Sequence, residues 1–145
     1  MKTLEQWFAE YGESHQHPTN QWIHKVCVPL IFFSIVGLLI LIPYSLGPLR
    51  VGEILIAIAL GWYFTLGPKP FVVMLAQLAI CYVLFYALRQ VTDPLLPLII
   101  IFVLAWLGQF YGHKVEGKKP SFFKDLQYLL VGPLWVVKFL FKGRF

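Results

Sequence analysis

Charged residues are scarce in this sequence, and that scarcity decides which class of protein it encodes. Only 13% of the 145 residues are Asp, Glu, Lys or Arg, whereas a typical soluble domain carries roughly 25%. Apolar residues make up 59% and aromatic residues 17%, and the mean hydropathy is +0.72. So little charge does not cover a water-facing surface, which argues against a soluble domain and indicates that lipid surrounds most of the chain.

Cysteine and the common catalytic motifs are also scarce or missing. The two cysteines, Cys27 and Cys81, lie far apart in apolar runs, which argues against a disulfide framework and a cysteine zinc site. The sequence contains no HExxH motif, no evident Ser/His/Asp set and no glycine-rich phosphate loop. No basic patch with interleaved aromatics lies outside the apolar runs, so the net charge of +5 favours an anionic membrane surface over nucleic acid.

Four apolar segments are long enough, or nearly long enough, to cross a bilayer. They occupy residues 26–44, 51–66, 71–88 and 95–111, and a spanning helix takes about 20 residues. A Gly-Pro-Lys-Pro turn after the second segment predicts that the second and third form a helical hairpin. The sequence therefore predicts an all-α, polytopic integral membrane helical bundle of about four spans, with residues 1–145 as a single domain.

Two further segments flank the four spans. Residues 1–13 predict an amphipathic helix lying in the membrane interface, with an apolar face formed by Leu4, Trp7, Phe8 and Tyr11. Residues 122–141 are apolar but include charges, which favours an interfacial or re-entrant helix broken at Gly132-Pro133. A fifth span over this last segment is the alternative.

Basic residues are distributed unevenly around the predicted spans. With four spans, ten of the twelve Lys and Arg residues fall on the side that holds both tails, and only Arg50 and Arg89 fall on the other. The positive-inside rule then places the N and C termini in the cytoplasm. Antiparallel packing of the first and fourth spans is expected to bring polar residues from both ends together at headgroup depth.

The histidines form the clearest candidate site. His15, His17 and His24 precede or begin the first span and His113 follows the fourth, so all four border the membrane on one side. Neutral imidazole is the commonest metal ligand in proteins. The spacing leaves two interpretations open: a metal site, or a solvated collar of polar residues among the lipid headgroups. Spacing does not identify the metal, because imidazole suits Zn, Cu, Fe and Ni.

Other polar residues share helix faces with these histidines. On a helix that begins at Pro18, Asn20 and His24 lie on one face, and His17 points in roughly the same direction. If the last span continues past Gly112, a second polar stripe forms from Gln109, His113 and Glu116. Packing in an apolar helix does not require such a stripe, so these residues are candidates to orient a ligand.

Two blocks of the sequence resemble a known family. The run YGESHQHPTNQWIHKVCVPLI, residues 11–31, resembles the N-terminal signature of the Mpo-type membrane family. The run AWLGQFYGHKVEGKKPSFFKDLQYLLVGP, residues 105–133, resembles its C-terminal signature. The family was long labelled a domain of unknown function. Its fungal member is an iron(II)-dependent dioxygenase of the endoplasmic reticulum, which shortens a 2-hydroxy fatty acid by one carbon in α-oxidation.

The resemblance implies an Fe(2+) cofactor and a ligand set for it. Carried over to this sequence, the ligands are His15, His24 and His113, with His17 as a less regular fourth candidate. The helix face favours His17 and the resemblance favours His15, so both are retained.

The resemblance also places Asn20 and Glu116 at motif positions, where they are expected to orient the metal ligands without binding the metal themselves. Lys114, with Lys118 or Lys119, is a candidate to attract the substrate carboxylate. The competing interpretation is that these lysines follow the positive-inside rule and meet lipid phosphates.

The function implied is an Fe(II)-dependent dioxygenase that binds a 2-hydroxy fatty acid as a chelator and cleaves its C1–C2 bond with O2. The expected partners are this acid, O2 and membrane lipid, without nucleic acid. The alternatives are a non-enzymatic lipid-binding or scaffold protein with a histidine collar, and a metal-dependent lipid hydrolase or hydroxylase. The sequence leaves open the oligomeric state and whether the membrane is a bacterial inner membrane or that of the endoplasmic reticulum.

Overall fold

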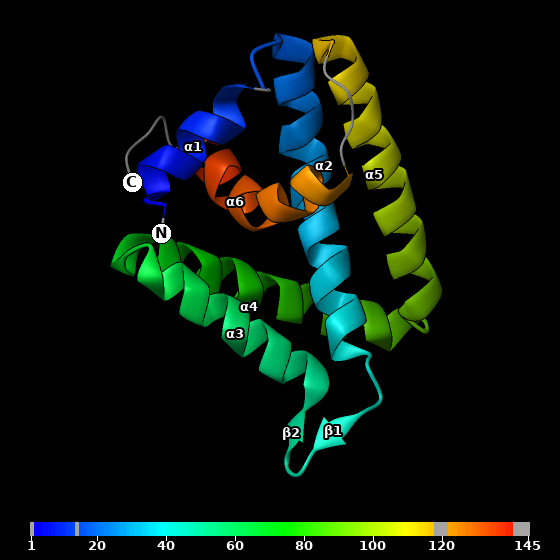
Figure 1. The fold of residues 1–145 in the computed structure, drawn as a ribbon. Coiled ribbons are helices and arrows are strands. Elements are labelled where there is room, and N and C mark those ends of the chain that lie inside the picture. Colours follow the sequence, from blue (N-terminus) through cyan, green and yellow to red (C-terminus); the bar gives the residue numbers. More distant parts are fainter. Residues whose placement is uncertain (1, 14, 118–121, 141–145) are drawn as a thin grey trace. The chain divides into compact units, whose positions relative to one another are not determined.

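A computed structural model describes residues 2–13, 15–117 and 122–140. These residues form helices and one short β-hairpin (Figure 1), in the order α1 Leu4–Glu13, α2 Pro18–Ile40, β1 Ser45–Leu46, β2 Leu49–Arg50, α3 Val51–Thr65, α4 Pro68–Val91, α5 Leu95–Glu116 and α6 Phe122–Leu140. The predicted all-α class is confirmed. Two boundaries that matter for the site also agree with the sequence, because α2 begins at Pro18 and α5 continues past Gly112.

Three of the described helices, α2, α4 and α5, are long and apolar enough to cross a membrane. The second predicted span corresponds to α3, whose 15 residues are fewer than the about 20 that a spanning helix takes. Within the described part of α6, a shorter apolar stretch covers Tyr128–Lys138. Helix length and composition thus support a membrane protein, and the count of four spans stays a prediction.

The chain divides into two compact units. One unit comprises Met1–Phe32 together with Val103–Phe145, and the other comprises Phe33–Phe102. The boundaries fall within α2 and α5, so each unit contains part of both helices.

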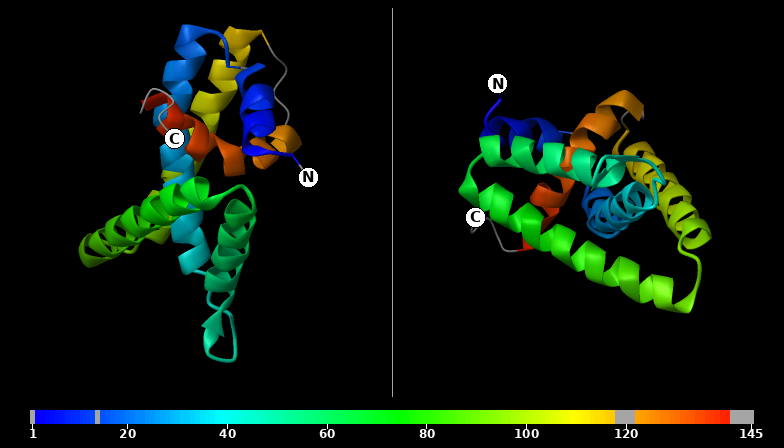
Figure 2. Two further views of the ribbon diagram at one scale, coloured as in Figure 1. Left: turned by 90° about the vertical axis from the view of Figure 1, so that its left-hand side faces the viewer. Right: turned by 90° about the horizontal axis from the view of Figure 1, so that it is seen from below.

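In the unit formed by residues 33–102, α3 and α4 form the helical hairpin that the sequence predicts. Figure 2 shows the two helices joined by a tight turn. Gly67 has a φ of 130° and leads into Pro68 at the first position of α4. Glycine adopts this backbone conformation without strain, and proline is favoured at a helix start. Before α3, β1 and β2 pair antiparallel, with Ser45 opposite Arg50.

In the other unit, two glycines of α5 permit the close approach of α2. A Cβ atom on Gly108 would lie 2.6 Å from Cys27 Sγ, and one on Gly112 would lie 2.3 Å from Asn20 Oδ1. Small residues four positions apart let two membrane helices approach closely. Because Asn20 begins α2 while Gly112 lies near the end of α5, the two helices run antiparallel here, as expected from the sequence.

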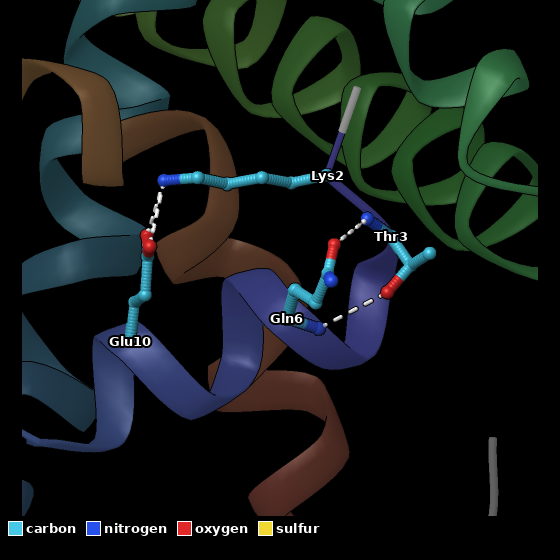
Figure 3. Close-up of polar contacts among 4 residues, drawn as sticks. All are labelled: Lys2, Thr3, Gln6 and Glu10. Carbon is cyan, nitrogen blue, oxygen red and sulfur yellow. Dashed lines mark hydrogen bonds and ion pairs between the residues drawn. The ribbon is translucent and has the colours of Figure 1, made fainter.

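The N-terminal helix α1 packs against α6 in this unit, as Figures 1 and 2 both show. A reciprocal pair of hydrogen bonds fixes its first turn (Figure 3). Thr3 Oγ1 accepts from the Gln6 amide N–H at 3.2 Å, and Gln6 Oε1 accepts from the Thr3 amide N–H at 2.9 Å. This capping box satisfies two backbone donors that a helix start leaves without partners. The half-exposed ion pair of Lys2 with Glu10, also in Figure 3, contributes little.

The predicted break at Gly132-Pro133 is wrong, because α6 continues through both residues to Leu140. Pro133 lacks an N–H and gives up one helical hydrogen bond, a local cost that favours a break. Burial outweighs this cost, since Val131 and Leu134 on either side are fully buried. Phe141, the predicted end of this segment, lies outside the described residues.

Candidate functional site

His15 lies in the link between α1 and α2 and is held by the last turns of α1. Its ring stacks on the Tyr11 ring, with the centroids 4.0 Å apart and the planes 2° from parallel. Its Nδ1 makes a short hydrogen bond to the Tyr11 backbone carbonyl. A carbonyl only accepts hydrogen bonds, so Nδ1 carries the proton and Nε2 carries the lone pair. The side chain is 3% exposed.

His24, in the second turn of α2, is fixed in the same way. Its Nδ1 donates to the Asn20 backbone carbonyl at 3.0 Å, one helical turn earlier, which again leaves the lone pair on Nε2. The ring is 1% exposed. Two histidines therefore have the same tautomer, set in each case by a backbone carbonyl four residues before them.

His113, near the end of α5, completes a group of three imidazoles. Its ring centroid lies 5.3 Å from that of His24 and 5.9 Å from that of His15, and the His15 and His24 centroids are 4.2 Å apart. All three side chains are buried. Residues far apart in the sequence meet because Gly108 and Gly112 allow α5 to approach the first turns of α2.

The fourth histidine, His17, is not brought into this group. It is exposed, and its Nδ1 accepts a hydrogen bond from the Thr19 amide N–H at 3.1 Å. This contact caps the start of α2. His17 therefore points into the turn before Pro18. It does not point in the direction of His24, contrary to the prediction from helix periodicity.

The remaining residues singled out from the sequence occupy different positions. Asn20 is fully buried, and its side chain lies against Gly112. Glu116 accepts hydrogen bonds from the backbone N–H groups of Gln16 and His17, just before α2. Lys114 is exposed. Lys118 and Lys119 lie outside the described residues.

The electrostatic environment keeps His15 neutral. Burial lowers the pKa of His15 to about 4, the hydrogen bond to the Tyr11 carbonyl opposes this effect, and the neighbouring His113 adds to it. At neutral pH the imidazole is therefore unprotonated, which is the form that binds metal ions.

A small pocket opens beside His15 and His24. Its volume, about 10 Å³ for a water-sized sphere, is enough for one water molecule or one ligand atom of similar size. The lining residues are Tyr11, His15, His24, Val28, Gln109, Tyr128 and Leu129. Sequence reasoning marked Gln109 only as part of a polar stripe.

Aromatic residues from α1 and α6 lie against His15, and sequence reasoning missed this role. Trp135 has its ring centroid 5.6 Å from that of His15 and 5.1 Å from that of Tyr11. Tyr128 lies 5.6 Å from Tyr11 between centroids. The periodicity of residues 1–13 predicts only that Tyr11 faces the membrane interface, and nothing in the α6 sequence indicates a contact with His15.

Among the described residues, no three His, Cys, Asp or Glu side chains are already arranged to hold a metal ion. A protein-family model described as "2-hydroxy-palmitic acid dioxygenase Mpo1-like" matches residues 1–144. No curated protein and no solved structure was found to match the chain.

Proposed function

The chain belongs to the Mpo1-like family, and on that premise we propose that it is an Fe(II)-dependent dioxygenase of 2-hydroxy fatty acids. In the proposed reaction, 2-hydroxypalmitic acid and O2 give pentadecanoic acid, and atom balance requires that the lost carbon leaves as CO2 with one water. The observation that carries the proposal is the meeting of three buried imidazoles, from His15, His24 and His113, in the unit that joins both ends of the chain.

The donor set suits a ferrous ion. Imidazole nitrogen is an ordinary ligand for iron, and three protein ligands leave coordination positions for a chelating substrate. His15 and His24 each donate Nδ1–H to a backbone carbonyl, and such a hydrogen bond orients the ring of a metal-binding histidine. Bound Fe(II) would supply the redox chemistry by which O2 cleaves the C1–C2 bond. Binding requires adjustment of the side chains, since no ready-made arrangement is present among the described residues.

The protein's own contribution is to position the substrate and exclude water. Glu116 ties the end of α5 to the turn that carries His15, and thereby fixes the separation of His15 and His113. The buried ring of Tyr11 and the partly buried ring of Trp135 cover His15 and limit the access of water to it. Holding the reacting groups in a fixed orientation lowers the entropic part of the barrier.

The place of the site suits a lipid substrate. The three histidines lie next to the first turns of α2 and the last turns of α5, which are the ends of two candidate spans. Trp22 and Tyr111 near these ends are 64% and 60% exposed, and Lys25 Nζ lies 4.2 Å from the Trp22 ring centroid. Aromatic and basic side chains of this kind mark the membrane interface. A fatty acid keeps its head at that depth, where Lys114 is a candidate to attract its carboxylate.

The proposal is tested by assaying anaerobically purified protein with Fe(II), 2-hydroxypalmitic acid and a measured amount of O2. We expect pentadecanoic acid to form in proportion to the O2 consumed, and we expect His24→Gln to abolish its formation. The matched control is His17→Asn, which changes the one histidine outside the group and retains a good capping residue. Pentadecanoic acid from His24→Gln at the native rate, or none from native protein supplied with Fe(II), would contradict the proposal.

A further inference from the structure

The side chain of Gln109 lines the pocket beside His15 and His24, and its Nε2 has no hydrogen-bond partner among the described residues. Gln109 lies on α5 one helical turn before His113, so the two side chains share a face. Its side chain is 4% exposed, and its Nε2 donates no hydrogen bond to any residue in the described part of the chain. Gln109 lines the pocket together with His15 and His24.

Burying an amide N–H without an acceptor costs free energy. Such a group at a pocket therefore indicates that a ligand supplies the acceptor. Buried side-chain donors in folded proteins nearly always have an acceptor. A methionine of similar shape would fill the same space without the cost of desolvating an amide. The position of Gln109 is therefore better explained by an acceptor that enters the pocket than by packing.

We propose that Gln109 donates a hydrogen bond from Nε2 to the carboxylate of the 2-hydroxy acid and is a substrate-binding residue. This inference rests on the proposed function for the identity of the substrate. The side chain would hold the C1 carboxylate in the pocket beside His15 and His24 and so select acids over neutral lipids.

The chemistry of the pocket favours a carboxylate as the acceptor. A carboxylate is a stronger acceptor than a hydroxyl group, and hydrogen bonds to charged groups are the strong ones. No Lys or Arg lines the pocket within the described residues, so the donors on its lining are neutral side chains: the Gln109 amide and the hydroxyl groups of Tyr11 and Tyr128. The pocket volume of about 10 Å³ admits one ligand oxygen but is too small for an acyl chain. The acyl chain of a bound acid would therefore lie outside the pocket, in the lipid.

The test compares Gln109→Met with the native protein in three measurements. The first is anaerobic binding of 2-hydroxypalmitic acid and of 1,2-hexadecanediol, which keeps the 2-hydroxyl group but has no carboxylate. The second is the thermal midpoint of the ligand-free protein, and the third is its iron content. The matched control is Gln77→Met on α4, where the amide Nε2 already has a partner in Met74 Sδ at 3.5 Å.

We expect Gln109→Met to weaken binding of the acid by about tenfold or more, the size of effect for a lost hydrogen bond to a charged group. Binding of the diol and iron content should be unchanged, and the thermal midpoint should be equal or higher, because an unpaired buried donor has been removed. Gln77→Met should leave the binding of both lipids unchanged.

Three results would overturn the inference. Equal affinity of both proteins for the acid would show that Gln109 does not contact it, and equal losses for acid and diol would show that it does not recognise the carboxylate. A lower thermal midpoint with loss of iron would assign Gln109 a structural role. Failure of the proposed function gives a different result. In that case the native protein binds the acid selectively through Gln109 but forms no pentadecanoic acid, which supports the role of Gln109 and contradicts the proposed reaction.

Discussion

Glu116 accepts a hydrogen bond from the His17 backbone N–H at 2.8 Å to Oε2 and 3.0 Å to Oε1. The contact joins the last turn of α5 to the turn before α2, and the Gln16 N–H donates to the same carboxylate. The peptide between His15 and Pro18 is therefore anchored to the helix that carries His113. A negative charge at this place also complements the positive end of the α2 dipole.

We predict that Glu116→Ala lowers both stability and iron content. Loss of charge-assisted hydrogen bonds at a partly exposed site should reduce the free energy of unfolding by about 1–2 kcal/mol. The separation of His15 and His113 would no longer be fixed, so iron should be released at lower chelator concentration. The measurements are denaturation in detergent micelles and chelator titration. Lys114→Gln changes an exposed neighbour and should leave stability unchanged, whereas an unaltered chelator titration in Glu116→Ala would count against the anchoring role.

Gly112→Ala should disturb the packing of α2 against α5. The added Cβ would lie 2.3 Å from Asn20 Oδ1, and Asn20 is fully buried, so either the Asn20 side chain or the two helices must shift. Overpacking of this kind costs about 1–3 kcal/mol, and we expect reduced iron content as well. The matched control is Gly12→Ala in α1, where a Cβ meets nothing within 4 Å. That change should stabilise the helix by up to about 1 kcal/mol. Equal stability of the two variants would contradict the close approach.

The stability of the metal-free protein should depend on pH through His15. Burial lowers its pKa from 6.5 to about 4, so between these values the unfolded chain binds more protons than the folded one. Stability is then fully present above pH 6.5 and is lost as the pH falls toward 4, by at most about 3 kcal/mol. The free energy of unfolding is measured from denaturation curves recorded at several values between about pH 7.5 and about pH 4. His15→Gln should flatten the dependence and His17→Asn should not, and a dependence that survives in His15→Gln would refute the assignment.

Local sequence signals predicted much of the fold. The start of α2 at Pro18 follows from the fixed φ of proline, the α3–α4 hairpin follows from its Gly-Pro turn, and the apolar face of α1 follows from its periodicity. The predicted break at Gly132-Pro133 failed because tertiary burial of Val131 and Leu134 outweighs a local cost, and no local pattern reports such burial.

The candidate site was predictable only in part. Antiparallel packing of the outer spans was enough to predict that histidines from both ends of the chain approach each other. It did not separate His15 from His17, because that choice depends on which side chain caps α2 and which stacks on Tyr11. The contact of Trp135 with His15 depends on the packing of α6, which the sequence pattern does not specify.

The proposed metal site is tested most directly by the iron content of protein purified without oxygen, with native protein, His113→Gln and His17→Asn measured in parallel. We expect about one iron per chain in the native protein and in His17→Asn, and almost none in His113→Gln. Native protein that takes up no iron from supplied Fe(II), or His113→Gln that retains it, would contradict the metal site and leave the histidines as polar residues of the membrane interface.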